Sequence, residues 1–163
     1  MKLRNNVEII DITHEDLVNL FSTALYGSSY LSAEYDKDFY NSISKDKKEG
    51  DCFEDHIADV LLNGGEIYIY DAYSEGEVYS DNGELIKEEY SDEEYAQYTL
   101  TLTDVIEGLQ RAANGTYKTN NDTKFIRQCF NEFADADEDC CDFDLTGADA
   151  LMQIITFNEL IYG

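Results

Sequence analysis

GGEIYIYD, residues 64–71, is the stretch that decides the fold. Its two glycines precede an alternation of isoleucine with tyrosine, and this period of two in β-branched and aromatic residues predicts a strand. YAQYTLTL, residues 95–102, alternates in the same way and predicts a second strand. Between them, Asn82-Gly83 is a dipeptide typical of hairpin turns, so residues 77–79 and 85–87 are expected to pair. An antiparallel sheet is therefore predicted from residue 65 to residue 102.

The segment between these two strands, residues 75–94, is named here the acidic arm. One cation, Lys87, stands among its many carboxylates. Charged edge strands protect a sheet against unwanted pairing, which explains some of these acids but not why nearly all carry one sign. We therefore expect the arm to bind a partner through Glu75, Glu77, Asp81, Glu84, Glu88, Glu89, Asp92, Glu93 and Glu94.

A second concentration of carboxylates, named here the acidic run, covers residues 135–144. It follows a predicted helix, whose C-terminal end already carries partial negative charge, so its acids crowd an unfavourable place. Such a placement calls for a neutralising cation or a basic partner, and we expect the partner. The candidate residues are Asp135, Asp137, Glu138, Asp139, Asp142 and Asp144.

Helical spacing of apolar residues recurs in the rest of the chain. Capped helix starts are predicted at Thr13, Asp51, Thr103 and Thr146, and a further apolar stripe runs over residues 125–133. Residues 28–49 mix aromatic and charged side chains without a clear period, which predicts irregular or weakly helical structure. The C-terminal residues 157–163 are apolar enough to dock on the core. The side chains expected to be buried are Leu20, Phe21, Ile57, Leu109 and Leu151.

The composition describes a soluble but very acidic chain. Its 163 residues, 43% of them hydrophobic, fit one compact domain over residues 1–163. The formal net charge of −25 would repel nucleic acid and anionic membranes, so neither is expected as a direct ligand. The sequence has neither a long apolar run nor a signal-peptide pattern, which predicts a cytoplasmic protein.

Two places in the sequence partly match metal-binding patterns. Asp135 begins like a calcium loop but lacks glycine at position six and glutamate at position twelve, while a register from Asp142 has the glycine and places Gln153 at position twelve. Cys52 and His56, four residues apart, could share a metal with Cys140 or Cys141, although reduced thiols explain the cysteines more simply. We therefore predict no cofactor.

Catalysis has little support in the sequence. The two histidines, His14 and His56, lie in no recognisable nucleophile signature, and carboxylates are too abundant for their pairing to be informative. The chain is predicted not to be an enzyme.

Several stretches, in the same order along most of the chain, resemble a family of small acidic proteins encoded by phages and mobile elements of low-GC Gram-positive bacteria. They are THEDL at residues 13–17, TALYG at 23–27, LNGGEIYIYD at 62–71, YTLTL at 98–102, GADA at 147–150 and LIYG at 160–163. The chain departs from that pattern in a longer acidic arm and a longer Asp-rich segment near Asp139. The resemblance implies a phage setting, in a host cytoplasm, and no catalytic residues.

Together these observations predict a single-domain α+β fold, a small antiparallel sheet covered by about four helices. The leading functional hypothesis is a phage-type inhibitor, anti-CRISPR or antirestriction, that mimics DNA phosphates. Its partner would be a basic nucleic-acid-binding host protein, either a restriction enzyme or an RNA-guided nuclease. Two alternatives stay open, a non-enzymatic interaction or regulatory module and a calcium-binding acidic module, and the sequence leaves the oligomeric state undetermined.

Overall fold

The computed structural model covers residues 1–163 and describes all of them except 6–7, 75–77, 80–84, 87–94, 119–121 and 137–142. The chain divides into two compact units. The first comprises residues 1–27 and 104–163, and the second comprises residues 28–103. The prediction of a single domain over residues 1–163 stays a prediction. No helix in the described ranges is both long and apolar enough to cross a bilayer.

The second unit is built on a mixed sheet. Its strands lie in the order β3-β4-β7-β5-β6, and their bounds are β3 Leu31–Tyr35, β4 Ile67–Asp71, β7 Ala96–Leu100, β5 Val78–Tyr79 and β6 Leu85–Ile86. Neighbours pair antiparallel except β5 and β7, which run parallel. The predicted strands β4 and β7 are confirmed, and so is the pairing of β5 with β6. The turn predicted at Asn82-Gly83 lies outside the described residues.

The sheet also contains a strand that the sequence did not predict. Residues 28–49 were expected to be irregular or weakly helical, but β3 within them pairs along its whole length with β4. Leu31, Ala33 and Tyr35 do alternate with Ser32 and Glu34. Unlike β4, β3 contains no β-branched residue, so the pairing partner, more than the local pattern, fixes the strand.

Helices α2 (Lys37–Ser42) and α3 (Phe53–Leu62), with the short 3-10 helix η1 (Lys45–Lys47), complete the second unit. The predicted start of α3 at Asp51 was wrong by one residue: Cys52 is the N-cap, and the carboxylate of Asp55 accepts its backbone N–H at 3.0 Å. Helix α3 packs on β3 and β4, and Ile57 is fully buried as predicted, like the strand residues Ile67 and Ile69. This packing supplies the helical layer over one face of the sheet.

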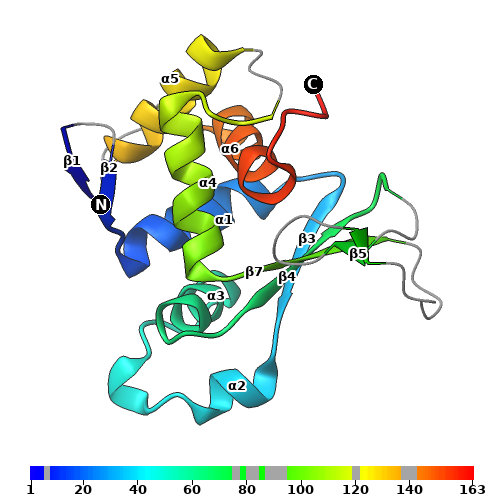
Figure 1. Ribbon diagram of the computed structural model, residues 1–163. Helices are drawn as coiled ribbons and strands as arrows, with labels where there is room; N and C mark the ends of the chain where they lie inside the picture. Colours follow the sequence, from blue (N-terminus) through cyan, green and yellow to red (C-terminus); the bar gives the residue numbers. More distant parts are fainter. Residues whose placement is uncertain (6–7, 75–77, 80–84, 87–94, 119–121, 137–142) are drawn as a thin grey trace. The chain divides into compact units, whose positions relative to one another are not determined.

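The first unit contains a hairpin of β1 (Lys2–Arg4) and β2 (Glu8–Asp11) and four helices. They are α1 (His14–Leu25), α4 (Leu102–Asn114), α5 (Thr123–Ala134) and α6 (Leu145–Phe157). The α4 residues 102 and 103 belong to the second unit. In Figure 1 the orange helix α6 lies against α5 and α1. It is buried on nearly every side from Gly147 to Thr156, so α6 is the centre of this unit.

The helix starts in the first unit show which local patterns decide the structure. Thr13 caps α1 as predicted, in a reciprocal capping box with Asp16. The predicted caps Thr103 and Thr146 were wrong, because α4 begins at Leu102, and Asp144 caps α6 by accepting the N–H of Gly147 at 2.9 Å. The predicted core residues Leu20, Phe21, Leu109 and Leu151 are all fully buried.

Each unit contains a glycine whose backbone is approached too closely for a larger residue. On α4, a Cβ added at Gly108 would lie 2.6 Å from the Cα of Ile155 on α6, so only glycine lets these helices approach as they do. In the second unit, a Cβ at Gly65 would lie 2.5 Å from the ring of Phe39. The second glycine of the opening GGEIYIYD stretch is therefore required by packing.

Candidate functional site

The structure describes two of the fifteen carboxylates predicted to bind a partner, Asp135 and Asp144. Asp135 is exposed at the C-cap of α5, where the helix dipole disfavours a negative charge, as the sequence predicted. Asp144 is exposed and caps α6, a structural role that its sequence context did not reveal. The remaining candidates lie outside the described residues: Glu75, Glu77, Asp81, Glu84, Glu88, Glu89, Asp92, Glu93, Glu94, Asp137, Glu138, Asp139 and Asp142.

The second calcium-loop register loses one of its possible ligands. Gln153, its position twelve, is fully buried, and its side-chain Oε1 accepts the backbone N–H groups of Ile161 and Tyr162, both at 2.8 Å. An oxygen that already accepts two hydrogen bonds has no lone pair left for a cation. Among the described residues, no group of three or more His, Cys, Asp or Glu side chains could hold a metal.

The same glutamine fixes the C-terminal segment. Its Nε2 donates to the carbonyl oxygen of Tyr162 at 2.9 Å and to the carboxylate of Asp149 at 2.8 Å. An ion pair between Lys118 and Glu159, at 3.0 Å, adds a second attachment. Docking of residues 157–163 on the core is therefore confirmed, but it is achieved through a buried polar group more than through the apolar character that predicted it.

Tyr35, Tyr40, Lys48, Phe53 and His56 form a compact group in the second unit, named here the aromatic–histidine cluster. The Tyr35 hydroxyl lies 2.7 Å from Nδ1 of His56, and the Tyr40 ring stacks on the imidazole with centroids 4.1 Å apart. The Nζ atom of Lys48 lies 4.1 Å from the centroid of Tyr40. Because one face of that ring is covered by His56, Lys48 occupies the other face, in a cation–π contact.

Carboxylates surround this cluster and act on Tyr40. Burial, followed by the charges of Asp59 and Asp51 among others, raises the pKa of the Tyr40 hydroxyl above its ordinary value. The phenol is therefore protonated across the physiological range. Phe53 keeps 41% of its surface exposed next to Tyr35, with ring centroids 5.7 Å apart.

The cluster changes the interpretation of Cys52 and His56. The suggested metal pair lies at the start of α3, but Nδ1 of His56 is used by Tyr35, and Cys52 is an exposed free thiol. Cys140 and Cys141, the proposed further ligands, lie outside the described residues. The sequence missed the cluster because Tyr35 and His56 are 21 residues apart, and only the pairing of β3 brings the tyrosine to α3.

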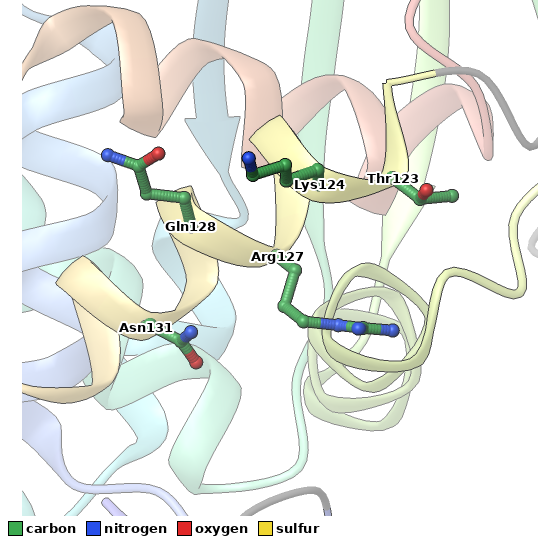
Figure 2. Close-up of a pocket in the computed structure, with 5 residues that line it drawn as sticks. All are labelled: Thr123, Lys124, Arg127, Gln128 and Asn131. Carbon is green, nitrogen blue, oxygen red and sulfur yellow. The ribbon is translucent and has the colours of Figure 1, made fainter.

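A shallow hollow of about 340 Å³ lies along the outer surface of α5. Its side chains belong to two neighbouring ridges of one helix, and Figure 2 shows Arg127 extending away from Lys124. The two cations therefore do not converge on one point, as an anion site would require. The lining residues are Thr123, Lys124, Arg127, Gln128 and Asn131.

Two arginines of the first unit bind backbone carbonyls at helix C-terminal ends. Arg127 donates through Nε to the carbonyl of Ala113 on α4 at 3.1 Å, and Arg111 donates through Nη2 to that of Ile154 on α6 at 3.2 Å. Burial lowers the pKa of Arg111 below its ordinary value. These cations satisfy helix ends, where the dipole favours positive charge.

Comparison with known proteins adds no identity: no family model, curated protein or solved structure matches this chain.

Proposed function

We propose that this protein is a non-enzymatic, phage-type inhibitor that presents carboxylates in place of DNA phosphates. Its target would be a basic nucleic-acid-binding host defence protein, a restriction enzyme or an RNA-guided nuclease. The observation that carries the proposal is the surplus of carboxylates over cations, and the acidic arm and the acidic run together hold fifteen of these acids against one lysine.

The surplus cannot be neutralised within the chain. With 36 Asp and Glu against 11 Lys and Arg, at least 25 carboxylates have no basic side chain of their own to pair with. Duplex DNA carries about two charges per base pair, so this surplus equals the charge of roughly a dozen base pairs. A positively charged channel that binds a phosphate backbone by charge and shape therefore cannot readily reject such a surface.

Several cations in the described part of the chain are engaged outside the acidic arm and the acidic run. Ion pairs between described residues join Lys2 to Asp11, Arg4 to Glu8 and Lys118 to Glu159. None of these acids belongs to the arm or the run. Arg111 and Arg127 bind helix carbonyls, so these two cations are also engaged outside the arm and the run.

The test is capture of the target from a host-cell lysate. The lysate is passed over the immobilised tagged chain at low salt, and the bound material is then washed at moderate salt. We expect a basic DNA- or RNA-binding protein to be retained at low salt and released by the moderate-salt wash. A variant with Glu88, Glu89, Glu93 and Glu94 changed to Gln should still fold but should no longer capture this protein. The matched control changes four acids outside both segments, E15Q, D38N, D46N and E107Q, and should keep it.

The outcomes separate the hypotheses. Equal loss in both variants would mean that net charge alone attracts the protein, and retention by the arm variant would remove the arm from the mechanism. A melting temperature raised by calcium but not by sodium at equal ionic strength would favour the calcium-binding module instead.

A further inference from the structure

The outer edge of β3 has the features of a strand that pairs with another strand. β3 is the last strand on its side of the sheet, since its one neighbour is β4. Natural edge strands are usually protected by proline, lysine, a bulge or short length. β3 has five residues in continuous register and no proline, lysine or bulge, so the charge of Glu34 is its one protection of this kind.

The register shows which backbone groups point outward. The N–H of Ala72 donates to the carbonyl of Tyr30 at 2.9 Å, in the same register that pairs Leu31 with Asp71. Hydrogen-bonded and non-hydrogen-bonded pairs alternate along an antiparallel ladder. Ser32 and Glu34 therefore bond to β4, while the N–H and C=O groups of Leu31, Ala33 and Tyr35 point to the open edge.

Most of these outward groups lack a partner among the described residues. The Leu31 N–H donates to the hydroxyl of Ser28 at 3.0 Å. No backbone hydrogen bond outside the β4 ladder involves Ala33 or Tyr35 among the described residues. An extended strand laid along this edge would satisfy them.

We propose that this edge pairs with β3 of a second copy of the chain, antiparallel and about a two-fold axis at Ala33. In that register Ala33 faces Ala33 of the second copy, and Leu31 faces Tyr35. These are the residues whose backbone groups point outward. In this register the free N–H and C=O groups of one copy therefore face those of the other copy and can form the hydrogen-bonded pairs of an antiparallel ladder.

The side chains are compatible with the same register. On the solvent-facing side, Ser32 of each copy lies opposite Glu34 of the other copy. A serine hydroxyl can donate a hydrogen bond to a carboxylate. No two glutamates face one another directly. Because like charges directly opposite destabilise a strand pair, this is the pairing that a chain of net charge −25 tolerates.

The charge of the copies sets how the pairing responds to salt. Two chains of −25 repel, and added salt screens that repulsion over about 10 Å at 0.1 M. Self-association should therefore strengthen with ionic strength. Binding of a basic target should weaken under the same change, so failure of one proposal is distinguishable from failure of the other.

The test is analytical ultracentrifugation of the full chain over a range of protein concentration, in about 0.05 M and about 0.5 M sodium chloride. We expect a reversible monomer–dimer equilibrium with a smaller dissociation constant at high salt. S32E places glutamate opposite Glu34 twice and should weaken the dimer about tenfold, whereas S32K places lysine there and should strengthen it about tenfold.

Thermal melting of both variants at a concentration where they are monomeric checks that the fold is retained. A chain that stays monomeric at both salt concentrations would overturn the proposal. A dimer whose dissociation constant is the same in wild type, S32E and S32K would overturn it as well, because that association would use another surface.

Discussion

The side chain of Gln153 binds the backbone of Tyr162 as a second strand would: Oε1 accepts the N–H at 2.8 Å and Nε2 donates to the C=O at 2.9 Å. Gln153 is fully buried in α6, the central helix of its unit. The amide therefore ties the C-terminal segment to the core, and both its oxygen and its nitrogen are needed.

Replacing Gln153 by Glu should destabilise the protein. The carboxylate keeps the acceptor but loses the donor to Tyr162, and it places a second charge beside Asp149, now 2.8 Å from Nε2. We expect a loss of about 2–4 kcal/mol in the free energy of unfolding, measured with urea. Q128E is the matched control, since exposed Gln128 also contacts an acid four residues away, Glu132, and it should cost under about 0.5 kcal/mol. Equal costs would show that burial of Gln153 is unimportant.

The two helical glycines of the first unit should respond to alanine with opposite signs. A methyl group at Gly108 would collide with the backbone of Ile155, so G108A should cost about 1–3 kcal/mol. At Gly147 the nearest atoms would lie at 3.7 Å, an ordinary contact, so G147A should be neutral or stabilise by up to about 1 kcal/mol. Thermal melting of both variants measures the difference, and a stable G108A would mean that α4 and α6 do not approach as described.

Asp144 allows its capping role to be separated from its charge. D144A removes the acceptor for the Gly147 N–H and should cost about 0.5–2 kcal/mol, while D144N keeps an acceptor and should cost much less. Both variants remove one negative charge, so both should weaken target binding equally. Unequal binding by two folded variants would show that Asp144 acts through the helix cap and not through its charge.

The buried thiol of Cys129 is expected to lower the free energy of unfolding at alkaline pH. Burial raises the pKa of its thiol to about 11, above the value of about 8.5 expected in the unfolded chain. A raised pKa means that the stabilisation is complete below the unfolded value and is lost as pH rises toward the folded one. Between about pH 8.5 and 11, unfolding free energy should therefore fall less steeply in C129A than in C52A, whose exposed thiol serves as control. Identical slopes would contradict burial of a protonated Cys129.

The parts of the fold that were predicted correctly are those whose causes are local. The capping box of Thr13 with Asp16 joins neighbours three residues apart, and the alternation in β4 repeats within five residues. At α6, however, the predicted cap was Thr146, whereas the observed cap is Asp144, two residues earlier. The observed start buries Gly147 so close to α5 that a Cβ added there would lie 3.7 Å from Cys129, and no local pattern contains this packing.

The candidate sites follow the same division. The concentration of acids is visible in the sequence because charge needs no fold to be counted. The sequence did not predict β3, the aromatic–histidine cluster or the hydrogen bonds between Gln153 and the C-terminal segment. Each of these depends on contacts between residues that are not neighbours in the chain, such as Tyr35 and His56. Phe125 shows the converse error: it fits the apolar stripe of α5, yet 40% of its surface is exposed.

The central claim is most directly tested by the salt dependence of binding to the captured target, in competition with duplex DNA. The account predicts that the chain displaces the DNA and that the logarithm of its affinity falls steeply with the logarithm of salt concentration. Neutralising Asp137, Glu138 and Asp139 should weaken binding and flatten that slope, while E15Q, D46N and E107Q together should leave it unchanged. Simultaneous binding of chain and DNA, or an affinity insensitive to salt, would contradict phosphate mimicry.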